Sequence, residues 1–132
     1  MRYLLDTDIC IYIIKKKPDS VLKRFRALRP GDLGISSVTL AELEYGVEKS
    51  QQQARNRDAL EDFLIPLEVL SFDSEAAARY GMIRWNLERT GKPIGNMDLL
   101  IAAHALALSL PVATNNVKEF ARVPGLRVEH WN

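Results

Sequence analysis

The hydrophobic positions of this chain form short apolar runs that alternate with longer segments of helical periodicity. The short runs predict strands over residues 3–5, 33–36, 67–70 and 112–113, with a fifth strand near Val128. The periodic segments predict helices over residues 9–14, 18–29, 40–47, 54–64, 74–89 and 97–108. Strands that alternate with helices predict an α/β fold, with a mostly parallel central sheet of four to five strands flanked by helices.

Polar residues in front of the periodic segments predict where the helices begin. Asp6-Thr7-Asp8 offers capping side chains to the helix over 9–14, and Asp73 offers one to the helix over 74–89. Ser37 or Thr39 is expected to cap the helix over 40–47, and Asn96 the helix over 97–108. These side chains bring hydroxyl, amide and carboxylate groups to the ends of the predicted strands.

The size and composition fit one globular domain that spans residues 1–132. A chain of 132 residues, 47% hydrophobic and 27% charged, buries roughly two thirds of its unfolded surface on folding. Its longest apolar stretch, residues 99–110, is interrupted by His104 and Ser109 and is too short to cross a bilayer. The first residues reach Asp6 after two aliphatic positions, which is not the pattern of a secretory signal. We therefore expect a cytoplasmic protein without a membrane span.

Charge is unevenly distributed along the chain, although the net charge is only +1. Residues 15–29 carry seven basic side chains and one acidic one, and residues 42–75 carry nine acidic and three basic ones. The basic segment is either a solvated helix face or a surface that binds a polyanion. The single cysteine, Cys10, lies among isoleucines and is expected to be a buried hydrophobic residue.

Three acidic residues occupy positions where open parallel sheets bind ligands, at the carboxyl ends of the strands. Asp6 follows the first strand, and Asp98 lies in the first turn of the helix that precedes the fourth strand. Thr114-Asn115-Asn116 follows that strand, so Asp6, Asp98 and Thr114 share one crevice if strands one and four are neighbours. Glu42, in the helix after the second strand, can reach the same place.

Carboxylates gathered in this way suit the hydrolysis of a phosphodiester. Divalent ions lower the pKa of a water molecule and neutralise charge on the phosphate, and hard ions such as Mg²⁺ or Mn²⁺ prefer carboxylate oxygens. A simpler interpretation is open for each acid: Asp6 or Asp8 caps a helix, Asp98 favours a helix dipole, and Glu42 is an exposed helical residue. Asp6 is the strongest candidate for a site residue, because it directly follows a buried strand and is therefore placed toward the crevice.

Four segments together resemble the PIN-domain ribonucleases, and most closely the VapC toxins of type II toxin–antitoxin systems. The resemblance extends from end to end of the chain, with the motifs in the same order and spacing. The four segments are Leu4-Leu5-Asp6-Thr7-Asp8, Ile35-Ser36-Ser37-Val38-Thr39-Leu40-Ala41-Glu42-Leu43, residues 94–105 around Asn96-Met97-Asp98-Leu99, and Thr114-Asn115-Asn116-Val117-Lys118-Glu119-Phe120.

This resemblance implies a single PIN-like domain that acts as a Mg²⁺-dependent endoribonuclease, with Mn²⁺ as a substitute ion. The implied substrate is structured RNA, with tRNA the leading class, and its cleavage would inhibit translation. A VapB-type antitoxin would neutralise the enzyme, and two copies would form a homodimer. The catalytic and metal-binding residues implied by the motifs are Asp6, Glu42 and Asp98.

The sequence departs from the family pattern after the fourth strand. Many PIN domains have an aspartate where this chain has Asn116, which adds no charge. Glu119, one helical turn later, is the candidate replacement, and the departure leaves open whether one or two metal ions bind. Thr114 is expected to hydrogen-bond Asp6 and orient it.

Other features favour different interpretations of the chain. His104 lies six positions after Asp98, off its helix face, and is expected to be structural; two histidines and one cysteine do not suggest a zinc site. A phosphate-accepting receiver domain is also small, α/β and acidic, but here the third strand leads to Asp73 only after Ser71 and Phe72, and the fourth strand leads into Thr114-Asn115-Asn116 where a receiver domain has a lysine. A catalytically silent binding module is a further alternative.

The apolar residues of the first two predicted helices exceed what one buried face needs. Some of them could form a groove for an antitoxin helix, or all of them could belong to the core. The residues concerned are Ile9, Ile13, Val21, Leu22 and Phe25.

Overall fold

A computed structural model describes residues 1–131 of the chain, which contain five strands and seven helices. The strands form one sheet in the order β3-β2-β1-β4-β5, and every neighbouring pair is parallel. The predicted α/β fold and parallel sheet are confirmed, as is the fifth strand. The strands are β1 (Tyr3–Leu5), β2 (Leu33–Ser36), β3 (Glu68–Leu70), β4 (Val112–Thr114) and β5 (Val128–His130).

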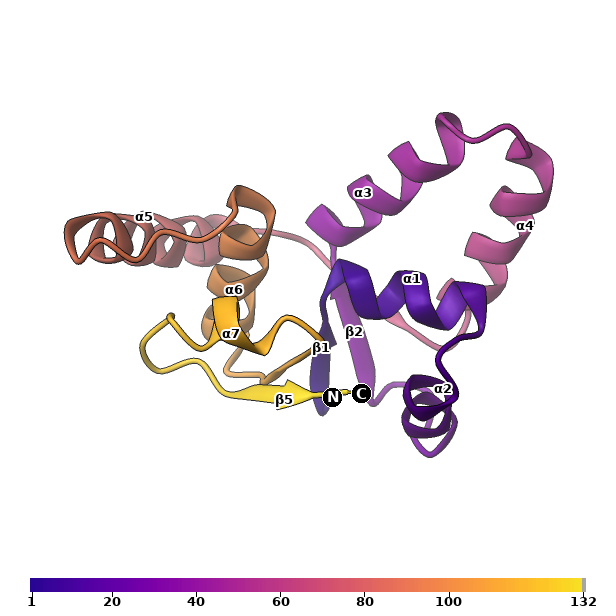
Figure 1. Ribbon diagram of the computed structural model, residues 1–132, viewed down its shortest axis with the longest axis horizontal. Coiled ribbons are helices and arrows are strands. Elements are labelled where there is room, and N and C mark those ends of the chain that lie inside the picture. The colour runs from indigo at the N-terminus through magenta and orange to yellow at the C-terminus, as the bar shows by residue number, and fades with distance from the viewer. Residues whose placement is uncertain (132) are drawn as a thin grey trace.

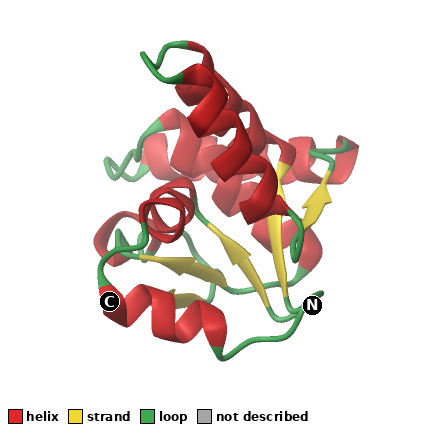
Figure 2. Ribbon diagram, turned by 90° about the vertical axis from the view of Figure 1, so that its right-hand side faces the viewer, coloured by secondary structure: helices red, strands yellow, loops and turns green. Residues whose placement is uncertain are grey.

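Helices connect every pair of consecutive strands, as parallel pairing requires. Figure 1 shows the first four helices on one side of β1 and β2, and the last three on the other. Figure 2 shows the strands enclosed between these two groups. The helices are α1 (Thr7–Lys15), α2 (Asp19–Arg26), α3 (Ser37–Glu48), α4 (Gln53–Leu64), α5 (Ser74–Arg89), α6 (Asn96–Leu108) and α7 (Val117–Phe120).

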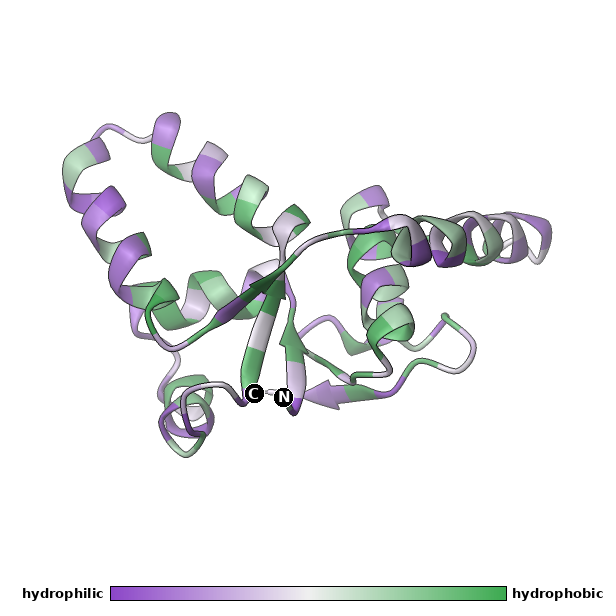
Figure 3. Ribbon diagram, turned by 180° about the vertical axis from the view of Figure 1, so that it is seen from behind, coloured by the Kyte–Doolittle hydropathy of each residue, from purple (hydrophilic) through white to green (hydrophobic). Residues whose placement is uncertain are grey.

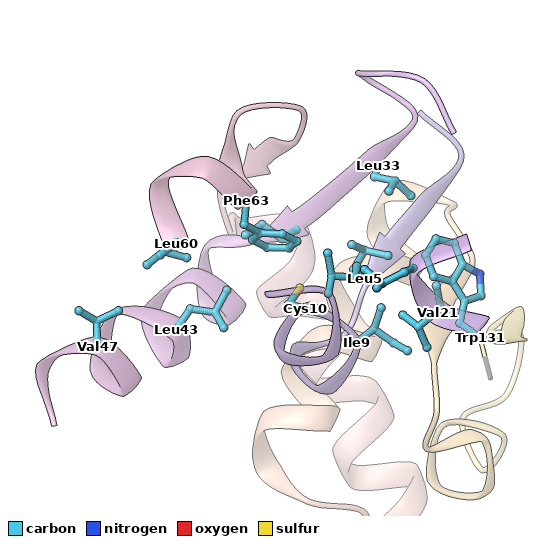
Figure 4. Packing of buried hydrophobic residues seen from close by; sticks show 14 residues of the cluster. Leu5, Ile9, Cys10, Val21, Leu33, Leu43, Val47, Leu60, Phe63 and Trp131 are labelled. Atoms are coloured by element: carbon cyan, nitrogen blue, oxygen red, sulfur yellow. The ribbon is translucent and has the colours of Figure 1, made fainter. Parts of the chain in front are cut away.

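Two hydrophobic cores cover the two faces of the sheet. Because successive side chains of a strand point to opposite faces, Leu5 packs with α1 to α4, whereas Leu4 packs with α5 to α7. Figure 4 shows the first core, in which Leu5, Cys10 and Trp131 lie close together. Hydrophobic residues accordingly concentrate on the central strands (Figure 3), as expected for a parallel sheet buried on both faces.

The helix caps confirm two predictions and correct two. Asp6 caps α1 and Asp73 caps α5. Each side chain accepts the backbone N–H of the residue three positions later in the sequence. Ser36, rather than Ser37 or Thr39, caps α3, because the last residue of β2 passes directly into the helix. Gly95 occupies the capping position of α6, and Asn96 is its first helical residue.

The five apolar residues of α1 and α2 that were considered for a groove pack in the core, which is the second of the two alternatives stated for them. Four of these residues are 7% exposed or less, and the fifth, Phe25, packs against the same core and stacks on Phe63 at 6.1 Å. The four are Ile9, Ile13, Val21 and Leu22. Cys10 is fully buried among them, as expected.

His104 is a buried residue of α6, in agreement with the structural role expected for it. Its ring packs edge-on against Phe72 with the ring centroids 5.5 Å apart. Burial lowers the pKa of His104, so the ring is neutral at physiological pH. Within residues 1–131, no helix has the length and apolar character needed to cross a membrane.

Candidate active site

The strand order places a crevice at the carboxyl ends of β1 and β4. The chain moves outward from β1 to β2 and β3, and then returns to the other side of β1 as β4. Such a reversal separates the loops of the two central strands and is where open parallel sheets bind ligands. Asp6 leaves β1 and Thr114 ends β4, so the two residues meet at this point.

Asp6 has two structural roles at once, as a helix cap and as a member of the crevice. One carboxylate oxygen accepts the backbone N–H of Ile9 at 2.8 Å, and the other accepts the hydroxyl of Thr114. The side chain of Asp6 is only 2% exposed. Burial, with smaller contributions from the nearby charges of Asp8 and Glu42, raises the pKa of Asp6 to about 6 despite these two donors.

Glu42 approaches the crevice from the second turn of α3. The hydroxyl of Thr7, the first residue of α1, donates to Glu42 Oε1 at 2.6 Å. The sequence pointed to Thr7 only as one of three residues that offer helix-capping side chains, and not as a site residue. The signal that could have identified it is its position, because a hydroxyl directly after Asp6 lies in the same first helical turn.

Asp98 forms a cluster with Asn116 and Glu119. The amide of Asn116 donates to Asp98 Oδ2 at 3.2 Å and to Glu119 Oε2 at 2.7 Å, and the backbone N–H of Gly95 donates to Glu119 Oε1 at 3.2 Å. Burial, together with the hydrogen bond to Glu119 and its charge, raises the pKa of Asp98 to about 8. The same hydrogen bond lowers the pKa of Glu119.

The three predicted acids therefore share one arrangement. Thr114 donates to Asp6, Thr7 to Glu42, and Asn116 to Asp98, and each donor comes from a different element of the fold than its acid. Asp8, the weaker candidate, is exposed in the first turn of α1 and caps no helix. In the described part of the chain, no ion pair involves Asp6, Glu42 or Asp98.

These carboxylates repel one another and lack a positive partner, which is the environment that a bound cation relieves. Their oxygens are the ligands that hard divalent ions prefer. No three His, Cys, Asp or Glu side chains of residues 1–131 are arranged to surround an ion as they stand. The donor set fits a divalent ion by its chemistry, although the described side chains do not converge on one point.

A groove of about 770 Å³ adjoins the crevice between α1, α3 and α4, and we refer to it as the α1–α3 groove. Thr7 and Glu42 form part of its wall, so the groove opens directly beside Glu42. The rest of the wall is mainly apolar, with Ile11 and Ile14 from α1, and it also includes the lysines Lys15 and Lys49. The basic segment predicted from the sequence thus approaches the acids through Lys15.

Comparison with known proteins identifies the family of this chain. Residues 3–126 match the PIN domain family, so the chain belongs to that family. The chain is 49% identical over 132 residues to the tRNA(fMet)-specific endonuclease VapC of Shigella flexneri, covering 100% of this chain and 99% of that protein. It is 46% identical over 133 residues to the ribonuclease VapC2 of Rickettsia felis, with the same coverage.

A solved structure of DNA-bound VapBC from Salmonella typhimurium superposes with a TM-score of 0.94 at 45% identity, covering 100% of this chain and 99% of the other. VapBC2 from Rickettsia felis, bound to a DNA fragment of its promoter, superposes with a TM-score of 0.93 at 44% identity over the whole of both chains. Within the PIN domain family, the chain belongs to the VapC ribonucleases. This relationship removes the receiver domain as an alternative.

Proposed function

We propose that this chain is a divalent-metal-dependent endoribonuclease that cleaves tRNA as the toxin of a type II toxin–antitoxin pair. The observation that carries the proposal is the crevice between β1 and β4, where Asp6, Glu42 and Asp98 are each fixed by a neutral donor from another element. A module that only binds a partner does not require buried carboxylates with raised pKa values, such as those of Asp6 and Asp98. Such groups cluster at catalytic sites.

Asp6, Glu42 and Asp98 would hold the ion, with Mg²⁺ the expected species and Mn²⁺ a substitute. A bound divalent ion lowers the pKa of a water molecule and neutralises charge that develops on the phosphate. Thr114 and Asn116 would keep two of the acids in place. Glu119 supplies the fourth negative charge that Asn116 does not, and it shares its hydrogen bond with Asp98.

The proposed substrate is tRNA, and the initiator tRNA in particular. The support comes from relatives that cover this chain almost completely and are named tRNA(fMet)-specific endonucleases. Lys15, Lys16 and Lys17 are exposed, and Lys15 lies in the α1–α3 groove with Glu42. These lysines would contact the phosphate backbone beside the acids. Cleavage of tRNA would inhibit translation, in the cytoplasm.

A VapB-type antitoxin is the proposed inhibitor, because the solved relatives are VapBC complexes. The α1–α3 groove is the surface that an apolar helix face of the antitoxin would cover, and this placement would also obstruct access to Glu42. We further propose a homodimer. Met82 and Trp85, on one face of α5, are 69% and 65% exposed, and contact with a second copy would bury them.

The deciding experiment incubates the purified chain, free of antitoxin, with total cellular RNA in Mg²⁺ or in EDTA, and maps new RNA ends by sequencing. We expect discrete cuts in tRNA that require Mg²⁺ and are absent with the Asp98→Asn variant. The matched control is Asp73→Asn, because Asp73 also lies at a helix N-terminus but not in the crevice. A folded wild-type chain that makes no metal-dependent cuts would show that the proposed function is wrong.

A further inference from the structure

The contact between Thr7 and Glu42 joins two elements that the sequence keeps far apart. Thr7 begins α1, and Glu42 lies 35 residues later in α3. The 2.6 Å separation of Thr7 Oγ1 and Glu42 Oε1 is short, as hydrogen bonds to charged acceptors are. Both side chains are half-buried, so water competes with the contact only in part.

The hydroxyl of Thr7 contacts two oxygen atoms. It lies 2.6 Å from Glu42 Oε1 and 3.3 Å from Thr39 Oγ1, and Thr39 is fully buried. A hydroxyl carries a single hydrogen, and a carboxylate oxygen only accepts, so the shorter contact assigns that hydrogen to Glu42. Thr7 therefore donates to Glu42 and has Thr39 as its second neighbour.

The orientation of the Glu42 side chain needs a constraint, because Glu42 lies beside an open groove whose wall includes two lysines. Lys15 and Lys49 line the α1–α3 groove together with Glu42. A glutamate has three rotatable side-chain bonds, and a free Glu42 could turn toward either lysine. With Oε1 engaged by Thr7, the other oxygen, Oε2, remains available to the crevice.

We propose that Thr7 is a positioning residue that holds Glu42 in the orientation required for metal binding. This inference rests on the proposed function. Asp6 and Thr7 are consecutive, so one turn of α1 both carries the first acid and restrains the second. The spacing between Asp6 and Glu42 is then determined by the backbone of α1 rather than by the flexible side chain of α3.

The test measures Mn²⁺ affinity by calorimetry for Thr7→Val and Thr7→Ser, each alone and combined with Glu42→Gln. We expect Thr7→Val to weaken Mn²⁺ binding about 10-fold to 100-fold, as loss of a group that orients a metal ligand typically does. Thr7→Ser keeps the hydroxyl and should bind Mn²⁺ nearly as wild type. In the Glu42→Gln background, Thr7→Val should cause no further loss.

RNA cleavage provides a second measurement on the same proteins. Thr7→Val should lower kcat while KM for the RNA stays unchanged, because Thr7 acts on Glu42 and not on the substrate. The control is Thr90→Val, which removes a hydroxyl bonded to the Asn86 carbonyl at the end of α5. That variant should retain wild-type affinity for Mn²⁺ and wild-type kcat.

Three results would overturn the inference: wild-type Mn²⁺ affinity in Thr7→Val, an equal loss in Thr7→Ser, or an undiminished loss in the Glu42→Gln background. The last result would mean that Thr7 acts through the fold in general. The proposed function fails by a different result, in which the wild-type chain cuts no RNA although its Mn²⁺ affinities follow the expected pattern.

Discussion

Two strand-to-helix junctions of this molecule look alike locally and differ in everything that concerns chemistry. Asp6 begins α1 after β1, and Asp73 begins α5 after β3. Each accepts a backbone N–H three residues onward, at 2.8 Å and 3.0 Å. Asp6, however, is 2% exposed, accepts a second hydrogen bond from Thr114 and has a pKa raised to about 6, whereas Asp73 is exposed to solvent.

The difference comes from the position of each strand in the sheet. β1 lies at the centre, where the chain reverses direction across the sheet, and β3 lies at an edge. The loop after β1 therefore has β4 beside it, and the loop after β3 has no strand on its outer side. A capping aspartate becomes a candidate catalytic residue only where the strand order places another strand, and the loop that follows it, beside the cap.

The largest expected effect that separates the two junctions is loss of RNA cleavage in Asp6→Asn. Removing a metal ligand forfeits several kcal/mol of transition-state stabilisation, or on the order of 100-fold to 1,000-fold in kcat. Thermal unfolding without metal should be unaffected or shifted upward, because asparagine caps helices as well as aspartate and carries no charge. Initial rates on tRNA and melting curves provide the check. If Asp6→Asn cleaves RNA, or if it fails to do so only because it is unfolded, Asp6 is a structural cap like Asp73 and the proposed difference between the two junctions is wrong.

Thr114→Val should have the next largest effect, since it removes the donor that Asp6 has and Asp73 lacks. Loss of such an orienting group costs about 10-fold to 100-fold in metal affinity or activity. Thr114→Ser should restore most of the rate, as it keeps the hydroxyl. Single-turnover rates at saturating Mg²⁺ measure the effect, and equal impairment by serine and valine would argue that packing is responsible.

The pH dependence of stability provides a third, smaller contrast. The folded pKa values of Asp6 and Asp98, about 6 and about 8, exceed the ordinary value of 3.8. Folding therefore favours the protonated acids, and the stability that they contribute below pH 3.8 is lost as pH rises to about 6 for Asp6 and to about 8 for Asp98. In EDTA, the melting temperature should fall over this range, and Mg²⁺ should raise it more at pH 8 than at pH 5.

Comparing Asp98→Asn and Asp73→Asn with wild type separates the contribution of Asp98 to the pH dependence of stability from that of other titrating groups. Asp98→Asn should flatten the dependence measured in EDTA, and Asp73→Asn should leave it as in wild type. Melting curves at pH 5, 7 and 8 in both buffers are sufficient. Identical profiles for wild type and Asp98→Asn would show that Asp98 does not carry the raised pKa.

The smallest effect on activity is expected from Asp73→Ala. Loss of an N-terminal cap destabilises a protein by about 0.5–2 kcal/mol, because the N–H of Ala76 loses its acceptor. Cleavage at a temperature where the variant is folded should equal that of wild type. Denaturant unfolding and initial rates measure the two quantities, and a large loss of kcat would mean that the second junction also supports the site.

The fold was largely predictable because β1, β2 and β4 are short apolar runs between helices of clear periodicity. The helix faces were less predictable. In α1, apolar residues occupy Ile9, Cys10, Ile11, Ile13 and Ile14, so no polar position marks the outer side. The structure turns Ile9, Cys10 and Ile13 to the core, while Ile11 and Ile14 line the α1–α3 groove.

The contacts of the candidate site show a similar limit. The neighbourhood of Asp6 and Thr114 followed from strand ends, once β1 and β4 were assumed to be adjacent. The cap at Ser36 was missed because three hydroxyl residues compete within four positions, and Gly95 has no side chain to signal a cap. Thr7 was missed because its partner, Glu42, lies in another helix, and no local pattern pairs them.

The hydrogen bond between Asp6 and Thr114 spans 108 residues of sequence, and this distance has a meaning for biosynthesis. A ribosome adds about 5–20 residues per second, so Asp6 exists for roughly ten seconds before its partner is made. During that interval β1 lacks β4, and the crevice has only one wall. A nascent chain would therefore lack the arrangement on which the proposed nuclease activity depends until nearly all of its sequence has been translated.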